Sequence, residues 1–228
     1  MPRPRRVELS LRPFSNDPWI VREVCGARVY ERGPRLLEGM NTLDVGAHIG
    51  TAATRASRQV GPQGSVIAFE PTPENHRLLL ENLRHNGCGN VRVSPTAVSS
   101  HAGVRAFRVS RVGASGGSAL EPLEMAMATD RVHSEIIEVE WVTLDGVVGQ
   151  LSLPSVDLLK IDVEGHELQV LVGAIDTLRR FHPRIVLETD PRGPLHRDIE
   201  SFLRDHGYET RSPEGAPWIL YGEPRAPS

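Results

Sequence analysis

The stretch that decides the fold is MNTLDVGAHIG, residues 40–50. An apolar run at 43–45 ends in a turn framed by Gly46 and Gly50, and a helix-compatible segment follows. Strand, glycine turn and helix in this order are typical of an α/β nucleotide site, because helix N-terminal amides and glycines let the ligand approach the main chain. A dinucleotide fingerprint has another glycine where this chain has His48. The turn therefore favours a ligand without a pyrophosphate over NAD or FAD.

Buried-strand patterns recur along the chain. Residues 65–70, 156–162 and 184–188 contain nearly continuous apolar runs, which suit parallel strands buried on both faces. Helical patterns separate these runs, and two closing strands are expected at 208–211 and 218–221. We therefore predict an α/β fold: a Rossmann-like, doubly wound, seven-stranded sheet, mostly parallel with one antiparallel strand, and with helices on both faces.

The chain is predicted to form one domain with additions. Residues 1–40 precede the glycine turn and are interpreted as an N-terminal extension that acts as a lid, and residues 41–222 form the domain. Residues 100–138 break the α/β rhythm and are interpreted as an insertion or substrate loop, with a hairpin partner at 138–143. Residues 223–228 are expected to be a frayed tail.

Two shorter segments carry predictions of their own. Asp17-Pro18 predicts the start of a helix, with Asp17 as N-cap and proline at the first helical position. Residues 91–99 are interpreted as a third strand that Pro95 interrupts.

Composition limits the class of protein. The 228 residues carry a formal net charge of −3, which argues against binding nucleic acid mainly by neutralising phosphates. No apolar run approaches the length of a membrane span, and no secretory signal is recognised. Cys25 and Cys88 have no CxxC spacing and are interpreted as reduced thiols of a cytoplasmic protein, with a disulfide left open. The oligomeric state also stays open, a homodimer included.

Acidic residues follow the predicted strands at the edge where ligands bind. Glu70 ends the second strand, 20 residues beyond Gly50, where a nucleotide-binding fold places an acid on the ribose hydroxyls. Asp162 ends a later strand that should adjoin the strand of Asp44. We therefore expect both acids to face one cleft.

Five blocks of the sequence resemble the FkbM family of class I S-adenosylmethionine-dependent methyltransferases. They cover most of residues 17–190 and are DVGAHIG (44–50), AFEPTPENHRLLLENLRHNG (68–87), AVSSHAG (97–103), TLD (143–145) and LLKIDVEGHELQVLVGA (158–174). The resemblance implies S-adenosyl-L-methionine as cofactor and a small-molecule acceptor with a free hydroxyl, a sugar or a secondary metabolite.

The resemblance also implies which residues bind the cofactor. These are Asp44, Gly46, Ala47, His48, Ile49, Gly50, Glu70, Pro71, Thr96, Ala97, Val98 and Asp162. Asp44 would orient the loop or the amino group of the ligand, and Glu70 would bind both ribose hydroxyls. Pro71 and residues 96–98 would line the adenine site. The His48 side chain could hydrogen-bond the loop or point to the substrate, and we expect the loop role because a buried polar group needs a partner.

A base is needed to remove the proton of an aliphatic hydroxyl during methyl transfer. His166 is the first candidate because its pKa is ordinarily near neutrality, Glu164 is the second, and Asp162 would orient either. Glu188 ends the next strand and is assigned to the substrate. Glu188 and Asp162 together could bind Mg²⁺, but a pair of acids is weak support, and we predict no metal.

Three other classes of protein remain as alternatives. A nucleic-acid methyltransferase should carry an Asn/Asp-Pro-Pro-Tyr-type loop where residues 162–165 read Asp-Val-Glu-Gly. An NAD-dependent oxidoreductase should carry the missing glycine. A non-catalytic cofactor-binding scaffold would keep the glycine turn, and the intact acids at 44, 70 and 162 argue against it.

Overall fold

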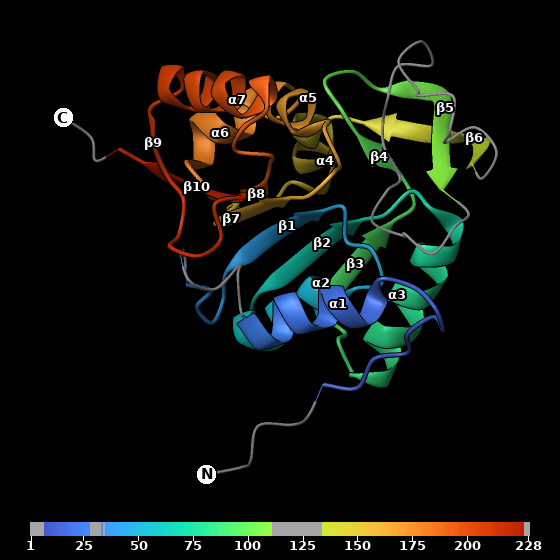
Figure 1. Cartoon of the computed structure of the whole chain (residues 1–228). Coiled ribbons are helices and arrows are strands. Elements are labelled where there is room, and N and C mark those ends of the chain that lie inside the picture. The colour runs from blue at the N-terminus through green and yellow to red at the C-terminus, as the bar shows by residue number, and fades with distance from the viewer. Residues whose placement is uncertain (1–6, 28–32, 34, 111–133, 226–228) are drawn as a thin grey trace.

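A seven-stranded sheet forms the middle of the molecule in this computed structural model, which describes residues 7–27, 33, 35–110 and 134–225 (Figure 1). The strand order is β3-β2-β1-β7-β8-β10-β9. β10 pairs antiparallel with β8 and β9, and the other pairs are parallel. The strands are β1 (Asn41–Val45), β2 (Ser65–Phe69), β3 (Val91–Ser94), β7 (Leu158–Ile161), β8 (Arg184–Glu188), β9 (Tyr208–Arg211) and β10 (Ile219–Pro224). The predicted fold class is confirmed, although β10 extends two residues beyond residue 222.

Helices cover both faces of this sheet (Figure 1). One face carries α1 (Asp17–Val21), its continuation η1 (Arg22–Ala27), α2 (Thr51–Val60) and α3 (Pro73–His85). The other carries α4 (Leu144–Leu151), α5 (Glu167–Val172), α6 (Ile175–Phe181) and α7 (Pro194–Asp205). None of the described helices is both long and apolar enough to cross a membrane.

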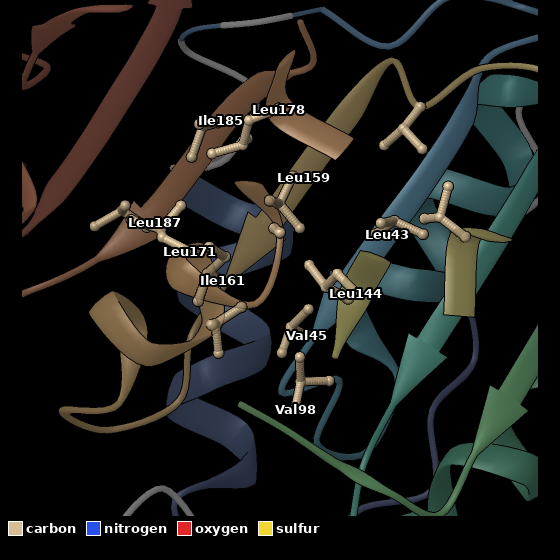
Figure 2. Packing of buried hydrophobic residues seen from close by; sticks show 14 of the residues in the cluster. Leu43, Val45, Val98, Leu144, Leu159, Ile161, Leu171, Leu178, Ile185 and Leu187 are labelled. Atoms are coloured by element: carbon tan, nitrogen blue, oxygen red, sulfur yellow. The ribbon is translucent and has the colours of Figure 1, made fainter. Parts of the chain in front are cut away.

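The main core lies between the sheet and the helices α4 to α7. Leu43 and Val45 of β1 meet Leu159 and Ile161 of β7 there (Figure 2). Alternate residues of a strand point to opposite faces, so Asp44, which lies between Leu43 and Val45, faces the α2 side instead. Full burial of each such aliphatic side chain contributes about 1.5–3 kcal/mol, which fixes the register of β1 against β7.

A second sheet of three strands packs beside the first. Its order is β4-β6-β5, with β4 (Ala97–Val98), β5 (Gly103–Ser110) and β6 (Ser134–Val142). The predicted hairpin is confirmed, since β5 and β6 pair antiparallel, although β6 begins at Ser134 and ends at Val142 where the sequence predicted residues 138–143. The prediction of one interrupted strand over 91–99 is wrong, because Pro95 lacks the N–H that a ladder needs and separates β3 from β4. The middle of the predicted insertion, residues 111–133, lies outside the described residues.

The chain order places a ligand site where the sheet reverses direction. From β1 the chain proceeds to β2 and β3 on one side, and it returns to β7 and β8 on the other. Open α/β sheets bind ligands outside the carboxyl ends of strands at such a switch point. Gly46 has φ 79° there, and a Cβ at this position would overlap the carbonyl oxygen of Asp162. Glycine therefore lets the loops that follow β1 and β7 come together.

Candidate active site

The loop after β1 is fixed to β2 by backbone hydrogen bonds. The N–H groups of Gly46 and Ala47 both donate to the carbonyl of Phe69, at 3.1 and 3.0 Å. Gly50 is left-handed (φ 87°) and precedes α2. His48 is also left-handed, at φ 52°, a conformation that costs a non-glycine residue free energy. The loop thus keeps a glycine-like backbone where the sequence has histidine.

A buried lysine ties this loop to β7. Lys160 is the register partner of Asp44, and its Nζ lies 3.0 Å from Asp44 Oδ1. The same Nζ donates to the carbonyl of Gly46 at 2.7 Å and lies 3.5 Å from Asp162 Oδ2. Burial alone would lower the pKa of Lys160, but the charges of Asp44 and Asp162 outweigh it and raise the pKa. Lys160 therefore stays charged and links the two loops.

The carboxylate of Glu70 occupies the predicted position at the end of β2. Its side chain is almost completely buried. Oε2 accepts from the N–H of His48 at 2.8 Å, and Oε1 accepts from Thr72 N at 2.9 Å and Asn75 Nδ2 at 3.3 Å. Burial raises the pKa of Glu70, and these hydrogen bonds act in the opposite direction. Glu70 therefore joins the glycine loop to the start of α3.

The His48 side chain contacts the N-terminal segment. Arg12 Nη2 donates to His48 Nε2 at 2.9 Å, and Asp17 Oδ1 lies 3.6 Å from the same nitrogen. Burial lowers the pKa of His48 to about 4, against the attraction of Asp17. His48 is therefore a neutral acceptor at physiological pH. The side chain thus contacts the N-terminal segment where a hydrogen bond to the loop was expected, and the backbone N–H of His48 binds Glu70.

The prediction of Asp17 as N-cap is wrong. Asn16 occupies the cap position, and Asp17 lies in the first turn of α1 with no exposed surface. The carboxylate accepts three hydrogen bonds from Arg12, from the backbone N at 2.8 Å, Nε at 3.1 Å and Nη2 at 2.7 Å. Burial alone would raise the pKa of Asp17, but Arg12 brings it down to about 2. The carboxylate of Asp17 is therefore paired with Arg12, and α1 has no side-chain cap hydrogen bond.

The residues predicted for the adenine site follow β3, which pairs with β2. Glu70 N donates to the carbonyl of Ser94 at 3.1 Å. Thr96 Oγ1 lies 2.9 Å from Ser94 Oγ, and Ala97 and Val98 are buried in β4. Pro71 directly follows Glu70 and is half-buried. The structure thus brings these residues to the same sheet edge as Glu70.

An acidic cleft of about 830 Å³ opens at the carboxyl ends of β7 and β8. We define the acidic cleft by the five carboxylates that line it, Asp162, Glu164, Glu167, Glu188 and Asp190. Trp218 and Arg192 also line it. Within the described ranges, no group of three or more His, Cys, Asp or Glu side chains is arranged to hold a metal ion.

Three carboxyls of the cleft, Glu164, Glu167 and Glu188, have raised pKa values, and burial is the largest cause in each. Burial, followed by the charges of Asp162, Glu23 and Glu164, raises the pKa of Glu188 to about 8. Burial, followed by the charges of Asp162 and Glu167, raises that of Glu164 to about 7. Glu164 is exposed to solvent at the cleft, where an acceptor can reach its carboxyl. All three groups hold protons more tightly than free carboxyls.

His166 points to a different part of the molecule. Its Nε2 lies 2.9 Å from Ser99 Oγ, and its ring meets the edge of Trp141 at a centroid distance of 5.4 Å. Burial, aided by the charge of Arg105, lowers the pKa of His166 to about 4. His166 is absent from the described residues that line the acidic cleft. The structure therefore gathers Asp162, Glu164 and Glu188 and leaves His166 apart from them.

The site fits S-adenosylmethionine by the chemistry of its donors and acceptors. Glu70 offers a buried carboxylate for a ribose diol. Asp44 Oδ2 has no hydrogen-bond partner among the residues that the structure describes, which leaves an acceptor under the loop. Together with the strand order and the loops at the switch point, these features define a class I S-adenosylmethionine-dependent methyltransferase.

Comparison with known proteins identifies the family. A model of the methyltransferase FkbM domain matches residues 44–210. The chain is 31% identical over 213 residues to 31-O-demethyl-FK506 methyltransferase FkbM of Streptomyces tacrolimicus, covering 83% of this chain and 81% of that protein. It is 32% identical over 144 residues to hexuronic acid methyltransferase AglP of Haloferax volcanii, covering 63% and 53%. The chain belongs to the FkbM family of methyltransferases.

A solved structure supports the fold. The chain superposes on methyltransferase FkbM from Methylobacillus flagellatus with a TM-score of 0.57 and 17% sequence identity. The superposition covers 92% of this chain and 48% of that one, so this chain spans about half of the larger protein. At this identity the likeness concerns the fold alone.

Proposed function

We propose that the protein transfers a methyl group from S-adenosylmethionine to a hydroxyl oxygen of a small molecule, a sugar or a secondary metabolite. The observation that carries the proposal is the acidic cleft, which adjoins the glycine loop through Asp162 and holds a carboxyl with a pKa near 7. The relative from Streptomyces tacrolimicus is named for an O-demethyl compound, which supports oxygen as the acceptor atom.

Glu164 is the base that best fits this reaction. S-adenosylmethionine, when bound, supplies an electrophilic methyl group and leaves as S-adenosylhomocysteine. Glu164 would take the proton of the acceptor hydroxyl as that oxygen receives the methyl group that the cofactor would supply. A carboxylate with a pKa near 7 is better matched to this task than His166, whose pKa is about 4. Glu164 therefore replaces His166 as the first candidate for the base.

The cofactor site is assigned to the loops at the switch point. Glu70 accepts from the ribose hydroxyls, the loop 46–50 faces the methionine part, and residues 96–98 line the adenine site. Asp44 orients the loop through Lys160, which bridges its carboxylate to the Gly46 carbonyl. Positioning of this kind contributes much of the rate enhancement in an in-line displacement.

The domain boundaries follow from the same assignment. The proposed methyltransferase domain begins at residue 41 and extends to the end of β10 at Pro224, residues 7–27 cover the site, and residues 100–110 and 134–138 contribute to the acceptor side. We also propose a cytoplasmic location, supported by Cys25 and Cys88, which are both free thiols.

Charge limits the class of acceptor. Carboxylates accept hydrogen bonds from hydroxyls and repel anions at close range. Asp162 and Asp190 therefore favour a neutral or cationic polyol over a carboxylate, and Glu164 adds to this charge once it has lost its proton. The same negative charge disfavours a nucleic acid.

Methyl transfer to a panel of acceptors tests the proposal. Tritium-labelled S-adenosylmethionine is incubated with neutral glycosides, macrolide alcohols, a hexuronate and RNA. The expected product is a labelled ether on a neutral acceptor, which survives mild alkali. Label in alkali-labile esters or in RNA would overturn the hydroxyl assignment. Absence of transfer to all of them, with the cofactor bound, would favour a non-catalytic scaffold.

A further inference from the structure

A closed ring of hydrogen bonds joins the N-terminal segment to the loop after β1, to Glu70 at the end of β2 and to the start of α3. Arg12 Nη1 donates to Asn75 Oδ1 at 2.8 Å, and Asn75 Nδ2 donates to Glu70 Oε1 at 3.3 Å. His48 N donates to Glu70 Oε2 at 2.8 Å, and Arg12 Nη2 donates to His48 Nε2 at 2.9 Å. Arg12 is the one member of this ring that comes from outside the matched family domain, residues 44–210.

The orientation of Arg12 is fixed by a buried carboxylate. Asp17 accepts from Nε and Nη2 of the guanidinium at 3.1 and 2.7 Å, and its side chain has no exposed surface. This contact leaves Nη1 for Asn75, while Nη2 also reaches His48. A lysine ammonium lacks this planar set of donors, so it could not donate to Asp17, Asn75 and His48 at the same time. The ring therefore requires arginine at position 12.

The segment that carries Arg12 is itself attached to α3. Glu8 and Asn86 exchange hydrogen bonds, with Glu8 N donating to Oδ1 at 3.1 Å and Nδ2 donating to Glu8 O at 2.6 Å. Ser10 and Asn82 exchange a similar pair at 2.6 and 3.2 Å. Asn82 Nδ2 also donates to the carbonyl of Ile49, inside the glycine loop, at 2.8 Å. The register of the segment on α3 thus delivers Arg12 to the ring.

We propose that Arg12 is a positioning residue for S-adenosylmethionine. It acts through Asn75 and His48, which hold the Glu70 carboxylate in the orientation that meets the ribose hydroxyls. This role of Arg12 rests on the proposed contact of Glu70 with the ribose. It does not depend on which acceptor is methylated. The relation is reciprocal, because a ligand that fixes Glu70 also stabilises the ring and the segment bearing Arg12.

Calorimetry with S-adenosylhomocysteine tests this role without an acceptor. Arg12→Ala is expected to raise the Kd about tenfold or more, the loss typical of removing a hydrogen bond from a charged group. The Kd of Arg12→Lys should lie between those of the wild type and Arg12→Ala, since lysine keeps the positive charge and lacks the planar guanidinium. The matched control is Arg84→Ala, because Arg84 lies exposed on α3 and its Nη2 lies 3.1 Å from Nε2 of the neighbouring His85. Its Kd should stay within about twofold of wild type.

Hydrogen exchange on the wild-type protein gives a second readout that does not depend on a variant. The amides of Ser10 and Arg12, which donate to Asn82 and Asp17, should exchange more slowly when S-adenosylhomocysteine is bound. A folded Arg12→Ala protein with the wild-type Kd would overturn the proposal. If that variant does not fold, unchanged exchange of these two amides in the wild type would overturn it. Failure of the acceptor panel would leave both readouts untouched.

Discussion

Replacement of Glu164 by glutamine tests the assignment of the base. Glutamine has nearly the same shape and cannot take a proton from the acceptor hydroxyl. A positioned general base contributes roughly 10²–10⁴-fold, so kcat should fall by about that factor. The Kd for S-adenosylhomocysteine should change little, since Glu164 lines the acidic cleft at the acceptor side.

The pH dependence of kcat/KM separates Glu164 from His166. The reaction needs the deprotonated base, and the pKa of Glu164 is raised to about 7. We therefore expect kcat/KM to reach a plateau above pH 7 and to fall about tenfold per pH unit below it. A His166 base, with its pKa lowered to about 4, would give a flat profile down to about pH 5.

The assay uses the acceptor that the labelled panel identifies. Asp198→Asn is the matched control, because Asp198 is an exposed acid on α7 outside the acidic cleft. Glu164→Gln should lose the inflection near pH 7, and the control should keep it. Retention of the wild-type kcat and profile in Glu164→Gln, with loss of activity in His166→Gln, would refute the assignment.

Three further predictions concern the frame of the site. Gly46→Ala should abolish S-adenosylhomocysteine binding in calorimetry, because its Cβ would overlap the loop after β7, whereas Gly89→Ala, in open space, should bind normally. Lys160→Met should lower the free energy of unfolding by roughly 3–5 kcal/mol in urea titrations, because it leaves Asp44 buried without its cation; a loss below about 1 kcal/mol would contradict this. The pKa of His48 is lowered to about 4 in the folded protein, so the unfolded chain binds its proton at a higher pH. His48 should therefore lower the free energy of unfolding by up to about 3 kcal/mol as pH falls from about 6.5 to about 4. His48→Gln should weaken this pH dependence in urea titrations.

The sheet could be predicted because each of its strands has a recognisable local sequence pattern. Apolar runs, glycine turns and helical spacing recur within a few residues of one another, and they place Gly46, Glu70 and Asp162 at one edge. The region after β3 was harder, since Pro95 marks a change of sheet that sequence shows only as a break. The triplet at 143–145 also has a structural role: Thr143 caps α4 and accepts from Gly146 N at 3.0 Å.

The residues that sequence reasoning missed act through long-range pairing. Arg12 and Asn75 are 63 positions apart and meet only when the N-terminal segment lies along α3. The pairing of Lys160 could have been predicted from the sequence. Lys160 is the one charged residue within β7, and the strand of Asp44 was expected beside β7. His166 was ranked first on its ordinary pKa, and its neighbours Ser99 and Trp141 could not be inferred from spacing.

The most direct test of the account is a crystal structure with S-adenosylhomocysteine bound. We expect both ribose hydroxyls to donate to the carboxylate of Glu70, and the sulfur atom to face Asp162 and Glu164 across the acidic cleft. A ligand bound away from Glu70, or one whose sulfur points away from that cleft, would contradict the placement of the methyl donor.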